Sequence, residues 1–463
     1  MRVLRTSDLA LVGHEPSVDW MSSEYAILSH TWSKEEVLYE DLQPDKLAAA
    51  STKAGYLKIQ FLQQQASQDE LPYFWIDTCC IDKRSSAELQ ETINSMSAYY
   101  ALSRVCYVYL EDVEAGADWE MQFRNSRWFT RSWTLQELLS PENVRFFDRH
   151  WKPLGHLHDL VKLVSSITRI DTRLLLHKRD PDTYSTAQRM SWAAGRKATR
   201  VEDLAYSLLG LFHVNMTMLY GEGPRAFVRL QEKIIQQSTD HSIFAWERHE
   251  AADGKHHAQG FFAPSPVNFR HCGRVGRLSG LLPGAFRMTN RGLEIPLPIA
   301  TEVTPGGETG IVLALLDCYH SGATEEKPYF ALELLPIPVL FDKNRSGLGP
   351  ALFASHATAA YLVLGLRRLC VDGFRYYSER FSCQQIALFS GTEFTTMEIM
   401  LRRGPQWQTP GMMALRQRCA PSETKEGGPI TAAVETKPVE RSIASWEALW
   451  QHDNLNGLGR RSP

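Results

Sequence analysis

The 463-residue sequence lacks the features of a membrane or secreted protein. No segment offers about 18 uninterrupted apolar residues, and the amino terminus has no apolar core long enough for a secretory signal. We therefore expect a cytoplasmic protein without a membrane span. Net charge is also small, with 50 Lys plus Arg against 53 Asp plus Glu, so no overall field draws the chain to nucleic acid. We expect no nucleic-acid partner.

The sequence also lacks the usual patterns of cofactor and metal sites. Its eight cysteines do not form the repeated close pairs of a zinc ribbon or a disulfide framework. We expect buried thiols, with a catalytic cysteine as the less favoured alternative. No cluster of Cys, His, Asp and Glu has the spacing of a metal site, and no G-x-G-x-x-G follows a strand. We expect no metal and no resident cofactor, so that NAD, if it binds, is a substrate.

Residues 1–150 carry the pattern of an α/β domain with a parallel sheet. Short β-rich runs alternate there with amphipathic helical patterns. The runs are apolar almost throughout, as in strands that helices cover on both faces. The predicted strands are Tyr25 to Ser29, Tyr73 to Thr78, Val105 to Leu110 and Val144 to Phe147.

Two of the connections between these strands read as helical. Ser85 and Glu88 have the spacing of a capping box, and apolar residues then recur at steps of three and four, which predicts a helix. The connection from Pro44 to Ala66 is also helical in pattern but contains Gly55. It forms either one kinked helix or two.

The rest of the chain shows three successive sequence patterns. Residues 151–247 are mostly helical in pattern, and Tyr220 to Pro224 reads as a turn that feeds a helix; a glycine-rich phosphate cradle is the less favoured alternative. Residues 248–420 carry short β-prone runs and predict a β-rich domain. Residues 421–463 read as a flexible tail.

Four stretches resemble the fungal heterokaryon incompatibility (HET) family. They are YAILSHTW (25–32), FWIDTCCIDKRSSAELQETINSM (74–96), SRWFTRSWTLQELLSP (126–141) and EDLAYSLLGLFHVNMTMLYGEGPRAFVRLQ (202–231). The resemblance implies a factor in self/non-self recognition and programmed death of fused, incompatible cells. It also implies self-association or a partner incompatibility protein.

A second, more distant resemblance suggests a chemistry. The order of strands and helices up to W-T-L-Q-E-L is similar to Toll/interleukin-receptor (TIR) domains of innate immunity, which have a flavodoxin-like fold and a W-C-L-x-E-L segment. In that family the Glu of the segment is the catalytic residue of NAD cleavage. Carried over by position, this role falls on Glu137.

Further candidate site residues follow from the expected sheet. Ligands of parallel α/β sheets lie outside the carboxyl ends of the strands, where we expect Ser29, His30, Trp32 and Asp77 to converge. Trp133 precedes Glu137 by four residues and shares its helix face. Arg84 and Arg131, with Lys83, are candidates to neutralise a pyrophosphate.

Each of these residues also has a structural alternative. Glu137 can be a solvated or salt-bridged helix residue, and Asp77 can cap its own loop. His30 and Trp32 can be structural residues of the core. The sequence thus leaves two functions open: an NAD glycohydrolase, and a non-catalytic signalling and protein-interaction module. An enzyme needs Glu137 beside a cleft, whereas a module can bury Glu137 or pair it with Arg131.

Overall fold

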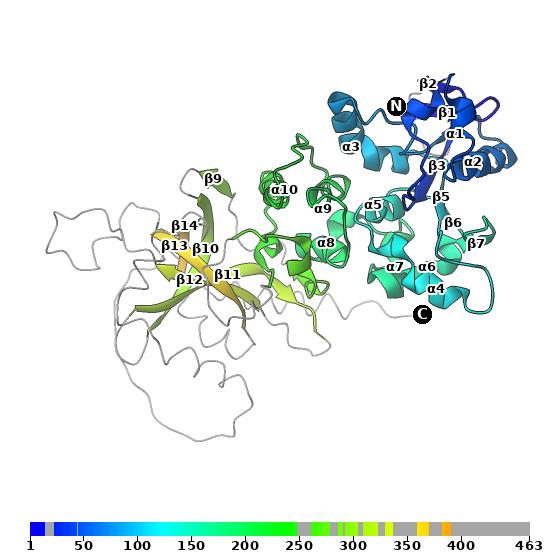
Figure 1. Cartoon of the computed structure of the whole chain (residues 1–463). Helices are drawn as coiled ribbons and strands as arrows, with labels where there is room; N and C mark the ends of the chain where they lie inside the picture. The colour runs from blue at the N-terminus through cyan, green and yellow to red at the C-terminus, as the bar shows by residue number, and fades with distance from the viewer. Residues whose placement is uncertain are drawn as a thin grey trace.

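The protein contains two sheets with a helical segment between them (Figure 1). The computed structural model describes residues 1–13, 23–43, 45–247, 261–277, 286–289, 292–303, 309–322, 329–336, 359–369 and 382–389. The predicted tail at 421–463 lies outside these residues. We refer to residues 1–156 as the α/β domain and to residues 157–247 as the helical segment.

Four parallel strands form the centre of the first sheet, and they confirm the predicted α/β class. They are β3 (Tyr25–His30), β4 (Tyr73–Trp75), β5 (Val105–Tyr109) and β6 (Val144–Phe147). Their spatial order is β4-β3-β5-β6, so the second strand along the chain lies beside the first and the others follow on the far side. This is the flavodoxin-like order. Every residue of β3 is buried, which explains its apolar sequence.

The order of the strands also fixes where the helices lie. Because crossover connections are right-handed, a chain that reverses direction across the sheet puts successive helices on opposite faces. Figure 1 shows α2 (Tyr56–Gln68) and α3 (Ser86–Ala101) on opposite sides of these strands. On the α3 side, the short helix α5 (Thr134–Leu139) packs against β3 and α3. The helix α4 (Trp119–Asn125) precedes it.

Sequence reasoning missed the antiparallel edges of this sheet. The strands β1 (Arg2–Arg5) and β2 (Leu11–Gly13) extend it beyond β4, and β7 (Pro153–His156) pairs with β6 at the other edge. The strand β7 lies where we expected helix. These strands have three or four residues each and too little alternation to give a periodic signal, so pairing with a preformed edge decides their conformation.

The structure confirms the N-cap predicted at Ser85 and the break predicted in the helical connection around Gly55. The hydroxyl of Ser85 accepts a hydrogen bond from the Glu88 amide at 3.3 Å, and α3 begins at Ser86. The connection around Gly55 forms two helices, α1 (Leu47–Ala50) and α2. A Cβ at Gly55 would lie 2.6 Å from the carbonyl oxygen of Glu35, so glycine permits a close backbone approach at this break.

The helical segment packs into the same buried core as the α/β domain. Its helices are α6 (Leu157–Thr168), α7 (Thr172–Leu175), α8 (Thr186–Ala193), α9 (Asp203–Tyr206) and α10 (Arg225–Ile235). The 3-10 helices of the described chain are η2 (Tyr39–Leu42), η3 (Arg127–Thr130), η4 (Pro181–Thr183), η5 (Gly210–Phe212), η6 (His241–Phe244) and η7 (Pro266–Phe269).

The turn before α10 binds an internal carboxylate. The amides of Gly221 and Gly223 donate to Glu202 at 2.7 and 3.0 Å. Hydrogen bonds from its own backbone amide and from these two amides lower the pKa of Glu202. Glu202 thus occupies the amides that a phosphate cradle would present, and the turn leads directly into α10, as predicted.

The second sheet confirms β-rich structure in the described part of residues 248–420. Its strands are β8 (Val275–Arg277), β9 (Arg287–Thr289), β10 (Gly292–Val303), β11 (Thr309–His320), β12 (Tyr329–Pro336), β13 (Ala359–Leu369) and β14 (Ser382–Phe389). The strand order is β8-β11-β12-β13-β14-β10-β9, antiparallel except between β13 and β14.

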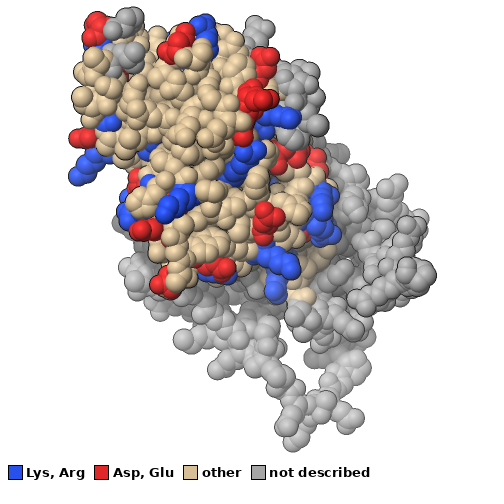
Figure 2. Space-filling model, turned by 90° about the vertical axis from the view of Figure 1, so that its right-hand side faces the viewer, with Lys and Arg blue, Asp and Glu red and all other residues tan. Residues whose placement is uncertain are grey.

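The described surface and helices bear on which partners the protein can bind. On the face shown in Figure 2, basic and acidic side chains of the described residues are interspersed over a largely uncharged surface. Among the described residues, no helix combines the length and apolar character needed to cross a bilayer.

Candidate functional site

The candidate site lies where the chain changes direction across the sheet. The neighbouring strands β3 and β5 are connected onward to opposite sides, which makes the space beyond their carboxyl ends the usual ligand position of such folds. Ser29 and His30 are the last two residues of β3. Asp77 follows the end of β4 by two residues, so its side chain reaches the same edge.

A hydrogen-bonded chain connects this edge to Glu137. The indole Nε1 of Trp128, in η3, donates to the hydroxyl of Ser29 at 2.7 Å. Ser29 in turn donates its hydroxyl proton to the carboxyl oxygen Oε2 of Glu137 on α5. Because Trp128 can only donate, Ser29 accepts from the indole and keeps its own proton for Glu137. The structure therefore places Ser29 and Glu137 in hydrogen-bond contact.

The environment of Glu137 perturbs its ionisation strongly. Burial raises the pKa of Glu137 to about 8, and the charge of Asp77 adds to the increase. The hydrogen bond from Ser29 and the charges of Arg131 and Arg196 act in the opposite direction. At neutral pH the carboxyl is mostly protonated in this arrangement. A carboxyl that is removed from water and surrounded by specific charged partners at the carboxyl ends of the strands is typical of functional sites. Buried networks with a structural role also shift pKa values in this way.

A second hydrogen-bonded group contains the other predicted residues of the strand ends. Both oxygens of Asp77 accept from side chains: His30 Nε2 lies 3.0 Å from Oδ1, and Trp32 Nε1 donates to Oδ2 at 2.8 Å. Burial acts to raise the pKa of Asp77, but the hydrogen bonds from His30 and Trp32 and the charge of Lys83 lower it below its usual value. Asp77 therefore joins His30 and Trp32 as a carboxylate.

The proton on His30 can be placed from its other neighbour. The ammonium of Lys58 lies 2.9 Å from His30 Nδ1, and an ammonium can only donate. Nδ1 is thus the acceptor, and Nε2 carries the proton that His30 donates to Asp77. Lys58 also forms a buried ion pair with Glu36. The relay Asp77–His30–Lys58–Glu36 links the strand end to the loop after β3.

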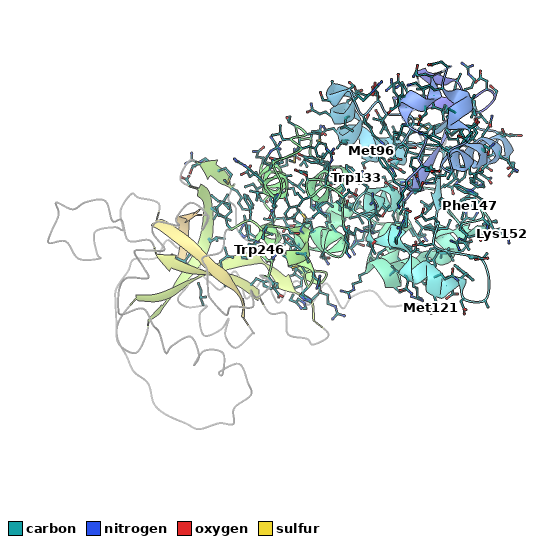
Figure 3. All side chains as sticks on the ribbon, in the orientation of Figure 1. Met96, Met121, Trp133, Phe147, Lys152 and Trp246 are labelled. Atoms are coloured by element: carbon teal, nitrogen blue, oxygen red, sulfur yellow. The ribbon has the colours of Figure 1, made fainter. Side chains whose placement is uncertain are left out.

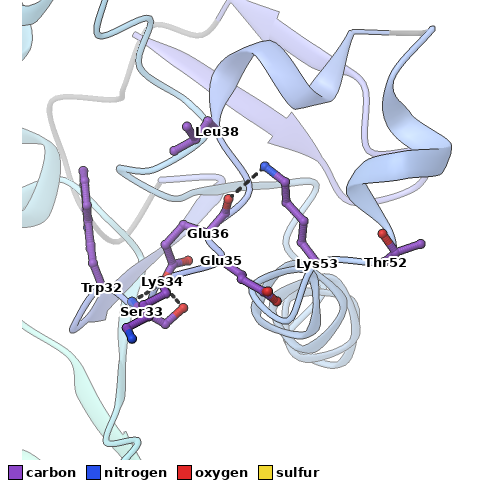
Figure 4. Close-up of a pocket in the computed structure, with 8 residues that line it drawn as sticks. All are labelled: Trp32, Ser33, Lys34, Glu35, Glu36, Leu38, Thr52 and Lys53. Carbon is purple, nitrogen blue, oxygen red and sulfur yellow. Dashed lines mark hydrogen bonds between the residues drawn. The ribbon is translucent and has the colours of Figure 1, made fainter.

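Trp32 lies at the border between this relay and a pocket. Its side chain is 42% exposed, and the ammonium of Lys83 lies 3.5 Å from the centroid of its ring. The Nζ of Lys83 is buried and has no hydrogen-bond acceptor in the described part of the chain. Figure 4 shows the pocket, of about 430 Å³, with Trp32 on one side and Lys53 on the other. An exposed indole beside a cation can take a flat ring or an anion.

Two predicted site residues, Arg84 and Trp133, interact with residues away from the strand ends. Arg84 is exposed and forms an ion pair with Asp82, with Nε 3.0 Å from Oδ1. Trp133 interacts with the helical segment: burial raises the pKa of Asp203, while hydrogen bonds from Tyr220 and Trp133 lower it. Figure 3 labels Trp133 where the α/β domain meets this segment. Its indole thus contacts Asp203 of α9, and its main-chain carbonyl accepts from the Glu137 amide at 3.5 Å.

Three residues around Glu137 were not found from the sequence: Trp128, Tyr100 and Arg196. Burial raises the pKa of Tyr100, and the charge of Glu137 adds to the effect, while its hydroxyl donates to the Leu28 carbonyl at 2.9 Å. Arg196 approaches from the helical segment. None of the three has a spacing that signals a site, because they come from three separate parts of the chain. Among the described residues, no group of three or more His, Cys, Asp or Glu is arranged to hold a metal ion.

Comparisons with known proteins match two parts of the chain. The sequence model of "Heterokaryon incompatibility protein (HET)" matches residues 25–121, which include Ser29, His30, Trp32 and Asp77. A domain of unknown function, DUF8212, matches residues 225–261. The chain is 44% identical over 247 residues to the vegetative incompatibility protein HET-E-1 of Podospora anserina.

This match covers 50% of the present chain and 18% of that protein, so the chain corresponds to less than a fifth of the relative's length. No solved structure matches. The matched family model and the similarity to HET-E-1 show a HET domain in the amino-terminal part of the chain.

Proposed function

We propose that this protein acts in vegetative incompatibility, as a factor that triggers death when genetically different cells fuse. The proposal is supported by the HET domain and by the similarity to a vegetative incompatibility protein. In this role the α/β domain is the effector. Its activation involves self-association or a partner incompatibility protein.

We propose further that the effector reaction is hydrolysis of NAD to ADP-ribose and nicotinamide. The observation that carries this proposal is the Glu137 carboxyl, hydrogen-bonded by Ser29 and desolvated at the strand ends. Cleavage of an N-glycosidic bond passes through an oxocarbenium-like ribose, which a carboxylate stabilises. The distant similarity to TIR domains assigns the same role to Glu137.

The reaction balances with water as the only co-reactant. The bond between ribose C1′ and the ring nitrogen breaks, and its electron pair leaves with neutral nicotinamide. The water oxygen forms the new bond to C1′, and one proton is released. Glu137 accepts from the ribose hydroxyls in its ionised form, while Ser29 holds its second oxygen. The positive nicotinamide ring of bound NAD favours that ionised form.

Other residues of the strand ends supply binding contacts in this proposal. Trp32 offers an exposed ring face for stacking, and Arg131 places positive charge near Glu137, where it can act on the pyrophosphate. Asp77 and His30 hold Trp32 and the loop after β3 in position. Arg84, paired with Asp82, has no role in this arrangement.

The test is expression of the full chain in a host whose NAD and survival are followed together. Glu137→Gln keeps the size and the hydrogen-bond acceptor of the side chain but cannot ionise. Glu120→Gln, at an exposed position of α4, is the matched control. We expect wild type and the control to deplete NAD and kill, and Glu137→Gln at equal protein level to do neither. Death with constant NAD refutes the glycohydrolase.

A non-catalytic signalling module is the second candidate function. It is favoured by the partial burial of Glu137, by the hydrogen bond that Ser29 already donates to it, and by the charges of Arg131 and Arg196, which act on the carboxyl without a ligand. In this function the HET domain passes the death signal to a partner protein. The same experiment separates the two, because a module kills without consuming NAD and tolerates Glu137→Gln.

A further inference from the structure

The helix that carries Glu137 has little internal support. α5 has only six residues, and its N-cap residue, Trp133, makes no side-chain capping hydrogen bond. A helix this short is not stable by itself in water and leaves the amides of its first turn without intrahelical partners. Contacts from outside must therefore fix its position.

Arg196, in the helical segment just after α8, supplies such contacts. Its Nη1 donates to the carbonyl oxygen of Arg131 and to the hydroxyl of Thr134, both at 2.9 Å. Its Nε donates to the Trp192 carbonyl at 3.2 Å, which anchors the guanidinium to the end of α8. One side chain thus connects α8 to the first turn of α5.

The backbone beside Arg196 strengthens this connection. The Lys197 amide donates to the Thr130 carbonyl at 2.6 Å, and the Ser132 amide donates to the Lys197 carbonyl at 2.9 Å. Arg131 and Lys197 form a parallel β-bridge. The turn before α5 is therefore attached to the helical segment by main-chain and side-chain hydrogen bonds together.

Arg196 is only 8% exposed, and its guanidinium donates hydrogen bonds to neutral oxygens of α5, of the turn before it and of α8. A buried cation whose acceptors are all neutral is costly to the folded state. A longer-range anion is the natural reason for a charge at this position.

We infer that Arg196 is a positioning residue for Glu137, through which the helical segment holds α5 and sets the charge state of the candidate site. The helical segment is then part of the functional unit. This inference rests on the proposed NAD hydrolysis only for its kinetic consequence, whereas the effect on the ionisation of Glu137 is independent of it.

Electrostatics agree with this geometry. Burial lowers the pKa of Arg196 to about 10, and the charge of Glu137 acts to restore it. Reciprocally, Arg196 lowers the pKa of Glu137 against the stronger effect of burial. The other titratable and charged groups around Glu137 are Asp77, Arg131, Tyr100 and Cys106. Arg196 is the member of this set that comes from the helical segment.

The test combines a titration with kinetics on the full chain. The pH slope of the difference in unfolding free energy between a protein and its Glu137→Gln derivative falls to zero at alkaline pH, and the midpoint of that fall reports the folded-state pKa of Glu137. Three backgrounds are compared: wild type, Arg196→Met and Arg196→Lys. Arg225→Met, at an exposed position of the same segment, is the control.

We expect Arg196→Met to move this midpoint upward by about one pH unit, since a nearby cation is lost. Arg196→Lys keeps the charge, so its midpoint stays near that of wild type. For NAD hydrolysis we expect kcat to fall roughly tenfold or more in both variants with a similar KM, because Glu137 is displaced and not removed. Arg225→Met should match wild type in both measurements.

The two proposals can fail separately. A midpoint that is the same in wild type and Arg196→Met overturns the inference, whatever happens to NAD. Absence of NAD hydrolysis in wild type, with the shift of the midpoint intact, overturns the enzymatic proposal and supports the positioning role. Should Arg196→Met not fold, Arg196→Lys decides: a wild-type kcat in that variant refutes the need for the guanidinium.

Discussion

Replacement of Glu137 by glutamine should make the folded protein less sensitive to alkaline pH. In the wild type, burial raises the pKa of Glu137 from 4.5 to about 8, so the folded chain holds a proton that the unfolded chain releases. The stabilisation from this proton is fully present below the unfolded pKa and is lost as pH rises through about 8. Glutamine has the same shape and no proton to lose.

The magnitude follows from the two pKa values. About pH 6 lies roughly two units below the folded-state pKa of Glu137. At about 1.36 kcal/mol per unit, the proton on Glu137 then stabilises the folded state by about 2.7 kcal/mol. At about pH 9 the contribution is close to zero. The stability of Glu137→Gln relative to wild type should therefore increase by about 2 to 3 kcal/mol across this range.

The assay is denaturant unfolding of the full chain at a series of pH values, followed by tryptophan fluorescence. The buried Trp128 donates to Ser29 and so reports on this region. Subtracting the wild-type curve from that of Glu137→Gln cancels every other titrating group, and the exposed Glu120→Gln shows the size of any non-specific effect.

A parallel pH dependence of wild type and Glu137→Gln would refute the reasoning, because it would mean that Glu137 ionises alike in the folded and unfolded states. A difference of the opposite sign would mean that the carboxylate form is the stabilised one. In that case the charges of Arg131 and Arg196 outweigh burial, and Glu137 forms a buried ion network.

Three further outcomes are expected. If Glu137 acts as a carboxylate in NAD hydrolysis, kcat/KM should rise roughly tenfold per pH unit up to an apparent pKa near 8 and then level, and a flat profile contradicts this. Asp77→Asn should lower the free energy of unfolding by about 1 to 3 kcal/mol at neutral pH, because His30 and Trp32 lose a carboxylate acceptor. Chemical unfolding measures this loss, and a variant as stable as the wild type contradicts the prediction. Gly210→Ala should lower the free energy of unfolding by about 1 to 3 kcal/mol, because the new Cβ would lie 2.1 Å from the Cβ of Ser97 on α3. If the double mutant Gly210→Ala, Ser97→Gly regains none of this stability, the clash is not the cause.

Much of the α/β domain was predictable from local signals. The four parallel strands were found because burial on both faces demands continuous apolar runs, and α3 was found because Ser85 caps it. The edge strands β1, β2 and β7 were missed, since their conformation comes from pairing with neighbours and not from their own residues. The tail predicted at 421–463 lies outside the described residues and stays a prediction.

The candidate site was predictable only in part. Ser29, His30, Trp32 and Asp77 follow strands whose carboxyl ends share one edge, so the fold class alone brings them together. Arg84 and Trp133 are residue types that bind pyrophosphates and flat rings, but their side chains interact with Asp82 and Asp203. No spacing in the sequence could reveal these interactions.

The sequence by itself thus determined the fold class, the family resemblance and the edge of the sheet where polar residues gather, because these depend on periodicity and on order along the chain. Only the tertiary structure decided the state of Glu137. The pKa of Glu137 depends on the burial of its side chain, on the hydrogen bond from Ser29 and on the charge of Arg196. Arg196 is far along the chain and reaches α5 from the helical segment. Desolvation and Coulomb interactions depend on distance in space, and distance in space is set by packing.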